Sequence, residues 1–508
     1  MKHMRRFLWK DISKEDLIMA SNKEVHASSA GEAFVYFFKG IKAYFTDFGT
    51  AISKGDTAVK LSTVLMGAGY FARNKIVVGL LTMIYEVLFV LMCIFYAAPN
   101  LAKFGTLGTT VRSTAFDPVT MQNTVIQGDN SFLILLNSVI ALFMIFVFVL
   151  TWIHNIKRQY ELQLDKEKGN HINTFVEDVK SLVNGRFNIT LMTLPTLGVV
   201  LMNVIPILIL IAIAFTNYDQ QHMPPSSLFT WVGLTNFRNL VNLSNNSAFG
   251  YAFFRVLGWT LVWAFFSTFT CFLGGIVMAK LITYRKVKFP KFWRTLFVVT
   301  IAVPQFVTLL LVRYFFGDTG IVNSICASTG ITSFLQSIGL VANHLTYIPF
   351  LTHPGWAKFM IVMINIWVGV PYQMLVATGV LLNIPESQIE SAKLDGANTW
   401  QIFWHITMPY VMFVEGPTLI TDFVRNINNF NVIYLLTQDT FVTTNQTLAN
   451  ANAKEVDLLV TWLFRLTNEY YNYKMASVIG IIVFVICAVF SLIAFSKFLS
   501  GGREESYQ

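Results

Sequence analysis

The chain has 508 residues, of which 54% are hydrophobic and only 13% are charged, a composition outside the range of soluble globular domains. The formal net charge of +9 does not indicate a nucleic-acid partner, because Lys and Arg in an apolar chain mark cytoplasmic loops and orient the spanning helices. We therefore expect an all-α, polytopic membrane bundle that binds no nucleic acid. The four cysteines show neither disulfide nor metal-site spacing.

Residues 1–75 are basic, with about a dozen Lys and Arg, and too interrupted to cross a bilayer. We expect them in the cytoplasm, with no removable signal peptide among the first 30 residues. Ser29 and Glu32 fit a capping box, and large apolar residues follow at helical spacing beside Lys39 and Lys42: Phe34, Phe37, Phe38, Ile41, Phe45 and Phe48. This pattern predicts an amphipathic helix in the lipid headgroups. A helix docked on the bundle, or part of a small packed core, is the alternative.

Eight apolar segments of spanning length follow, at about residues 76–98, 131–154, 191–215, 253–282, 295–316, 359–382, 411–436 and 475–495. An even number places both termini on one side. Segments 155–190, 283–294 and 383–410 share that side, and with the two tails they carry about 26 Lys and Arg, against about five in the opposite loops. The distribution predicts a multi-pass protein of the cytoplasmic membrane with both termini in the cytoplasm.

The segments divide the chain into four parts. Residues 1–75 form the cytoplasmic N-terminal region, and residues 76–190 add two spans and a cytoplasmic loop. A six-helix core occupies residues 191–498, and residues 499–508 form a cytoplasmic tail. The seventh span is the least regular, because Glu415, Asp422 and Arg425 interrupt it.

Residues 385–409, PESQIESAKLDGANTWQIFWHITMP, form a polar stretch between two long apolar runs. Pro385 suits the first position of a short helix that ends before Gly396, and Asn398 with Gln401 predicts a capped second helix. Trp400, Phe403 and Trp404 follow at helical spacing. We call this pair of helices the elbow. It suits docking into a groove of a partner protein, although an ordinary interfacial loop has a similar composition.

The elbow closely resembles the EAA motif of the membrane subunits of ATP-binding-cassette importers, through Glu390, Ala392, Asp395, Gly396, Ala397, Phe403, Ile406 and Pro409. Ser391 and Met408 depart from that motif. The resemblance implies that the elbow is a coupling helix seated in a cleft of a separate ATPase subunit. The coupling residues are then Glu390, Ala392, Asp395, Gly396, Ala397, Trp400, Phe403 and Trp404.

Nothing in the sequence indicates chemistry carried out by the chain itself. It has no Walker A loop and no H-E-x-x-H cluster. We expect no catalytic residues, no metal and no cofactor on this chain, with ATP and Mg²⁺ held by the partner ATPase subunits.

Two polar stripes interrupt the apolar helices on either side of the elbow. Asn365, Gly369 and Tyr372 share one face of the sixth segment, with Pro371 beside them. In the seventh segment one face carries four polar residues: Asp422, Arg425, Asn426 and Asn429. Charged groups at membrane depth are costly unless they are paired or line a water-filled path. The second stripe therefore predicts a translocation pathway, with an Asp422–Arg425 ion pair joining two helices as the alternative.

Both stripes resemble the larger permease subunit of maltose and maltodextrin importers, known as MalF-type, and the likeness covers about residues 191–495. It implies a sugar site of Asn365, Val368, Gly369 and Tyr372 on one helix and Asp422, Arg425, Asn426 and Asn429 on the other. It also implies a second permease subunit, two ATPase subunits and an extracellular binding protein that delivers an oligosaccharide. The charges of Asp422 and Arg425 depart from that family, as does the short loop at residues 216–250.

We therefore expect the permease subunit of an ATP-driven importer of maltodextrin-like oligosaccharides. The alternative is an ion-coupled secondary transporter in which Asp422 and Arg425 form the coupling pair. A membrane enzyme or a receptor is less favoured, because the sequence offers no acid, base or metal constellation.

Overall fold

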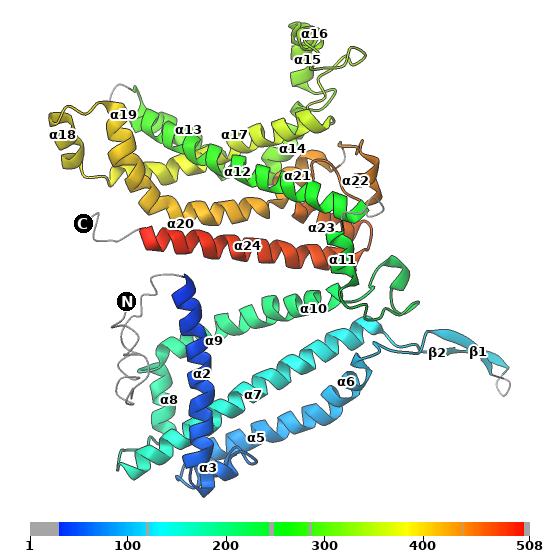
Figure 1. The fold of residues 1–508 in the computed structure, drawn as a ribbon, viewed down its shortest axis with the longest axis vertical. Helices are drawn as coiled ribbons and strands as arrows, with labels where there is room; N and C mark the ends of the chain where they lie inside the picture. The colour runs from blue at the N-terminus through cyan, green and yellow to red at the C-terminus, as the bar shows by residue number, and fades with distance from the viewer. Residues whose placement is uncertain (1–29, 118–120, 243–247, 284–286, 439, 502–508) are drawn as a thin grey trace, which may run out of the picture.

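The computed structural model describes residues 30–117, 121–242, 248–283, 287–438 and 440–501. Within these residues the regular secondary structure is helical apart from one antiparallel hairpin and an isolated bridge, and turns and loops connect the elements. This confirms the expected all-α membrane bundle. Figure 1 shows the long helices lying side by side, with short elements at both ends of the bundle.

The elements before residue 243 are the helices α2 (Ala30–Lys54), α3 (Thr57–Leu61), α4 (Ala68–Phe71), α5 (Ile76–Met92), α6 (Ala98–Phe104), α7 (Ser131–Glu167), α8 (Phe175–Val183), α9 (Phe187–Val199), α10 (Ile205–Ala214) and α11 (Thr235–Val241), and the strands β1 (Ser113–Asp117) and β2 (Gln122–Ile126). A π-helical turn joins α5 to α6, and another joins α9 to α10.

The elements that follow are α12 (Ala248–Thr283), α13 (Pro290–Ala302), α14 (Gln305–Phe315), α15 (Ile321–Ser328), α16 (Ile331–Ser337), α17 (Pro354–Leu382), α18 (Glu386–Leu394), α19 (Thr399–Ile402), α20 (Met408–Ile427), α21 (Phe430–Thr437), α22 (Gln446–Asn450), α23 (Leu459–Asn468) and α24 (Tyr473–Gly501). A π-helical turn, Phe403–Thr407, joins α19 to α20.

In the described residues, six helices are long and apolar enough to cross a membrane, and they match six of the eight expected segments: Ile76–Phe104, Ser131–Glu167, Phe187–Ala214, Ala248–Thr283, Pro354–Leu382 and Tyr473–Phe498. The expected segment at 295–316 is not one straight helix, because α13 and α14 meet at an angle of 93°, although together they have the length and composition of one broken span. Pro304 explains the break: proline holds the preceding residue in an extended conformation, and Val303 has a ψ of 125°.

The prediction of one helix at 411–436 is wrong. Helix α20 ends at Ile427, and the side chain of Asn429 accepts a hydrogen bond from the Val432 N–H at 3.3 Å to start α21. Because α20 carries three charged residues, Glu415, Asp422 and Arg425, it is not among the six apolar helices. Figure 1 nevertheless shows α20 lying between α12 and α24, with its axis along theirs and its chain direction opposite.

The segments expected on opposite sides of the membrane lie at opposite ends of the bundle (Figure 1). Helices α8, α18 and α19 are at one end, which we call the elbow end. Helices α15, α16 and α22 and the hairpin are at the other end, which we call the far end. Which end faces the cytoplasm stays a prediction from the distribution of Lys and Arg.

Helix α2 lies crosswise to α7 (Figure 1). Its C-terminal half is docked, since the rings of Phe48 and Trp152 are 5.4 Å apart and Lys157 lies 4.2 Å from the ring centre of Tyr44. In the preceding turns, the side chains of Val35 and Tyr36 are about half exposed. The C-terminal half of α2 is therefore docked on the bundle, which was the alternative to a helix in the lipid headgroups. Contact of the N-terminal half with lipid stays a prediction. Ser29, the expected cap, lies outside the described residues.

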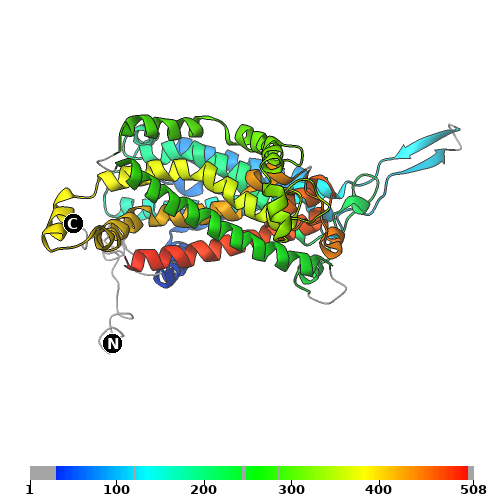
Figure 2. The ribbon, with the colours of Figure 1, turned by 90° about the horizontal axis from the view of Figure 1, so that it is seen from above.

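The hairpin β1–β2 was not expected from the sequence, and it extends away from the helices (Figure 2). Its base is held by Asp129, whose carboxylate accepts hydrogen bonds from Lys103 Nζ at 2.7 Å and from the N–H groups of Thr109 and Thr110 at 3.0 and 3.1 Å. The hydrogen bond from Lys103, followed by the two backbone donors, lowers the pKa of Asp129 from 3.8 to about 2.

A lowered carboxyl pKa stabilises the fold above the ordinary value, and the stabilisation is lost as the pH falls through the lowered value. We expect the wild-type base of the hairpin to resist pepsin at about pH 4, where the Asp129→Asn variant is already cleaved, and the two to be cleaved alike at about pH 2. Peptide mapping of the 105–130 region checks this. Equal cleavage of both chains at the higher pH would contradict the role of Asp129.

Candidate functional site

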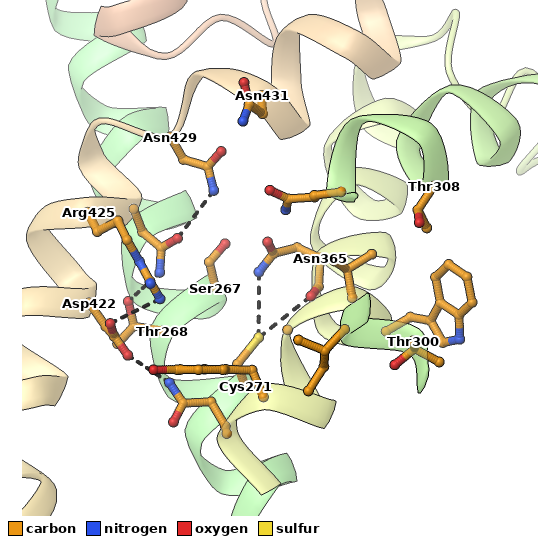
Figure 3. A pocket seen from close by; sticks show the side chains of 18 of the residues that line it. Ser267, Thr268, Cys271, Thr300, Thr308, Asn365, Asp422, Arg425, Asn429 and Asn431 are labelled. Carbon is orange, nitrogen blue, oxygen red and sulfur yellow. Dashed lines mark hydrogen bonds and ion pairs between the residues drawn. The ribbon is translucent and has the colours of Figure 1, made fainter. Parts of the chain in front are cut away.

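A cavity of about 710 Å³ opens among α12, α13, α14, α17 and α20 (Figure 3). All eight residues that the sequence predicts for a sugar site line it: Asn365, Val368, Gly369, Tyr372, Asp422, Arg425, Asn426 and Asn429. The fold therefore brings two stripes that are about 50 residues apart in the chain to facing walls of one space. In Figure 3, Asp422, Arg425 and Asn429 lie on one side and Asn365 on the other.

The α17 wall packs closely on α12. The amide nitrogen of Asn365 lies 3.5 Å from the Cys271 sulfur, and a Cβ at Gly369 would come within 2.7 Å of that sulfur. Only glycine fits this approach without a shift of α12. Tyr372 and Trp367 are about half exposed at the same cavity. The wall thus offers a buried amide together with two aromatic rings.

The α20 wall is built around Asp422. Its Oδ1 pairs with Arg425 Nη2 at 3.0 Å, and its Oδ2 accepts a hydrogen bond from Gln373 Nε2 at 2.7 Å. The Asp422 side chain is only 8% exposed, whereas that of Arg425 is 63% exposed. Both carboxylate oxygens are thus engaged by protein, and the guanidinium is the charged group that faces the open cavity.

Two asparagines continue this wall toward the far end. Asn426 donates to Thr268 Oγ1 on α12 at 2.9 Å, and its backbone carbonyl accepts from the Trp263 indole at 3.1 Å. Asn429 donates to Asn426 Oδ1 at 3.4 Å. These contacts bind α20 to α12 and hold the amides in place along the cavity.

Sequence reasoning missed several lining residues: Ser267, Thr268, Trp367, Gln373, Gln305 and Asn431. Gln373 follows Tyr372 directly in an otherwise apolar helix. Its amide is a sequence signal that could have added it to the predicted site. Ser267 and Thr268 lie in an apolar helix, where small hydroxyl residues are common and give little sequence signal.

The first elbow helix begins one residue later than expected, because Pro385 is the cap of α18 rather than its first residue. The second begins after Asn398 as expected, but it is not a separate short helix, because the π-helical turn Phe403–Thr407 continues α19 into α20. Gly396 has a φ of +81°, and the Ala397 N–H donates to the Ala392 carbonyl at 2.9 Å, which closes the end of α18. Asn398 and Gln401 form the predicted capping box.

The predicted coupling residues surround this turn. Glu390 and Asp395 are exposed, and Ala392 and Ala397 are half-buried beside Gly396. A shallow cavity of about 340 Å³ lies against Ala392, Asp395, Gly396 and Ala397. The elbow therefore presents a small-residue surface at the end of the bundle.

The three aromatic residues of the elbow do not share one environment. Trp400 and Trp404 are 69% and 45% exposed, respectively. Phe403 is half-buried, with Lys280 of α12 lying 4.3 Å from its ring centre. The two tryptophans are thus available to a partner, while Phe403 fastens the elbow to α12.

Comparisons with known proteins identify the family of this chain. Residues 271–501 match the model of the family described as binding-protein-dependent transport system inner membrane component. The chain is 31% identical over 462 residues to the maltodextrin transport system permease protein MdxF of Bacillus subtilis, covering 89% of this chain and 98% of that protein. It is 29% identical over 431 residues to the galactooligosaccharides transport system permease protein GanP of the same organism, covering 84% and 94% of the two chains.

Among solved structures, a bacterial ABC transporter involved in the import of the acidic polysaccharide alginate aligns with a TM-score of 0.46 and 24% identity, covering 63% of this chain and 98% of that one. The identity to the maltodextrin permease extends over nearly the full length of both chains. The chain therefore belongs to the family of membrane permease components of binding-protein-dependent ATP-binding-cassette importers, in its MalF-type carbohydrate branch.

Proposed function

We propose that this permease carries a maltodextrin-like oligosaccharide through the cavity between α17 and α20. The observation that supports this most is the meeting of all eight predicted sugar-site residues at one space of about 710 Å³. Sugar hydroxyl groups pair with amides and a guanidinium, and the apolar faces of sugar rings stack on aromatic side chains such as Tyr372 and Trp367.

The same proposal assigns the partners. A second permease subunit completes the path, two ATPase subunits hold ATP and Mg²⁺ and dock on the elbows, and an extracellular binding protein delivers the sugar. Closure of the ATPase pair then moves residues 385–409 and switches the cavity between two states. In this arrangement both termini are cytoplasmic, and the chain itself holds no nucleotide or metal.

The test is ATPase stimulation in the reconstituted complex with its cognate binding protein, across a panel of gluco- and galacto-oligosaccharides. We expect gluco-oligosaccharides to stimulate hydrolysis and galacto-oligosaccharides to leave it near the basal rate. A response to galacto-oligosaccharides alone would show that the substrate belongs to that sugar class instead. Relatives of similar identity are named for maltodextrin and for galactooligosaccharides.

The Asn426→Ala variant is expected to lower sugar uptake at least about tenfold while the complex still assembles. The change leaves the hydroxyl of Thr268 and the amide of Asn429 without their partner, and a lost buried hydrogen bond costs about 1 to 3 kcal/mol. The matched control is Asn468→Ala on α23, whose amide donates to the Phe464 carbonyl at 3.0 Å, within its own helix at the far end. Wild-type uptake by Asn426→Ala would remove this residue from the site.

The two candidate functions, an ATP-driven importer and an ion-coupled transporter, differ in their partner proteins and in their energy source. The importer copurifies with an ATPase and stops when Gly396 is replaced by proline. Uptake that persisted in that variant and followed a proton gradient would contradict the importer.

A further inference from the structure

A second cavity, of about 300 Å³, lies at the far end of the bundle between α12, α17 and the loop that follows α22. None of its lining residues lines the sugar cavity. Its charged and aromatic walls come from Arg255 and Trp259 of α12, Lys358 of α17, and Lys454 and Glu455 of the loop. Lys358 lies 4.8 Å from the ring centre of Trp259. Three cations therefore share this space with one carboxylate.

The carboxylate does not neutralise the two helix cations by direct contact. Oxygen Oε1 of Glu455 accepts hydrogen bonds from the backbone N–H groups of Thr444 and Asn445 at 2.9 and 2.8 Å. Lys454 reaches the Gln438 carbonyl at 2.9 Å. Arg255 and Lys358 thus remain the cations that face the cavity.

Three other cations at the far end are paired with carboxylates: Lys103 with Asp129, Arg465 with Asp457, and Lys474 with Asp219. The exposed Arg112 and Arg238 have no such pair among the described residues, but neither lines the cavity. Within the part of the chain that the structure describes, neither Arg255 nor Lys358 makes such a pair. Two like charges beside one cavity repel each other, and an anion between them removes that cost.

The surroundings of the cavity indicate what kind of anion it takes. Gly258 leaves open space where a side chain would stand, and Phe254, Val262 and Phe265 form an exposed apolar stripe along the same face of α12. The stripe runs from the cavity toward the middle of a membrane-spanning helix. A free anion makes no favourable contact with this apolar stripe, whereas an acyl chain packs on it and buries it.

We propose that this cavity binds the phosphate headgroup of an anionic phospholipid, with Arg255 and Lys358 as its ligands and an acyl chain along Phe254, Val262 and Phe265. The lipid belongs to the leaflet at the far end of the bundle. Cationic side chains near a membrane surface each add appreciably to the binding of anionic lipid.

The test uses the full-length chain, with all subunits that copurify, in nanodiscs containing equal amounts of phosphatidylglycerol and phosphatidylcholine. Native mass spectrometry then counts the lipids retained. We expect the wild type to retain phosphatidylglycerol in preference, and the Arg255→Gln/Lys358→Gln double variant to hold it about 30-fold more weakly. The matched control, Arg238→Gln, removes an exposed far-end cation outside the cavity and leaves retention unchanged.

A charge-neutral variant provides a second arm. Gly258→Phe fills the open space while keeping both cations, and it is expected to lower retention as the double variant does. Arg255→Lys, which keeps the charge, retains the lipid. Equal retention by the wild type and the double variant overturns the proposal. Displacement of the bound lipid by inorganic phosphate also overturns it, because the ligand would then be a soluble anion.

Discussion

The Gly396→Pro variant is expected to take up sugar about 100-fold more slowly than the wild type in a reconstituted complex, with the permease still folded in the membrane. Gly396 has a φ of +81°, and its N–H donates to the Lys393 carbonyl at 3.1 Å. Proline fixes φ near −65° and has no N–H, and such a misfit costs about 3 kcal/mol, which corresponds to about a hundredfold change in equilibrium. Sugar uptake and copurification of the ATPase measure the effect.

Gly339→Pro is a closely matched control. Gly339 also ends a short helix, has a φ of +76° and donates its N–H to a carbonyl three residues back, that of Gln336, at 3.0 Å. It lies after α16 at the far end, away from the elbow (Figure 1). We expect this variant to keep ATPase docking. Equal loss of docking in both variants would mean that the effect reports general misfolding rather than the elbow.

The Arg425→Gln variant is expected to lose most transport and part of its stability. It leaves the buried carboxylate of Asp422 with Gln373 as its remaining side-chain partner. Removing one member of a fully buried ion pair costs about 3 to 5 kcal/mol, and because Arg425 is itself largely exposed we expect about 1 to 3 kcal/mol. Thermal unfolding in detergent and sugar uptake give the two readings.

The Asp422→Asn/Arg425→Gln double variant then separates the two roles of the pair. It removes both charges, so we expect stability to return toward the wild-type value. Uptake is expected to stay low, because the guanidinium that faces the cavity is gone. Recovery of both stability and uptake would show that the pair has a structural role only. The alternative of a pair that joins two helices is wrong, because both residues lie on α20, three positions apart.

Hydropathy predicts the six long helices well, because spanning a bilayer demands some 20 apolar residues in a row. Hydropathy does not detect the helix breaks within 295–316 and 411–436, and the reason is local. A sliding average does not register one proline, such as Pro304, or one capping side chain, such as Asn429, and yet each ends a helix. The hairpin escaped prediction because its strands are only five residues long, and neither STAFD nor QNTVI shows a sustained alternation of apolar and polar residues.

The candidate site also has a part that the sequence predicts and a part that it does not. Charged and amide residues in apolar helices are conspicuous, so Asp422, Arg425, Asn426 and Asn365 could be found by helical spacing alone. What spacing cannot supply is the partner of each group. Gln373 donates a hydrogen bond to Asp422, and Asn426 donates one to Thr268. These pairings depend on how α12, α17 and α20 cross, which only the packed structure shows.

The break between α13 and α14 has a consequence for mutational scans of this transporter. Ile301, Ala302, Val303, Pro304 and Gln305 line the cavity where one helix stops and the next begins. Helix ends leave carbonyl and N–H groups without intrahelical partners, and irregular backbone at membrane depth persists where it borders protein or water. Under the proposed function, a sugar hydroxyl on this side of the cavity would meet main-chain carbonyl groups, which every amino acid supplies. Alanine replacements there leave that recognition intact, and they would understate how much this wall contributes.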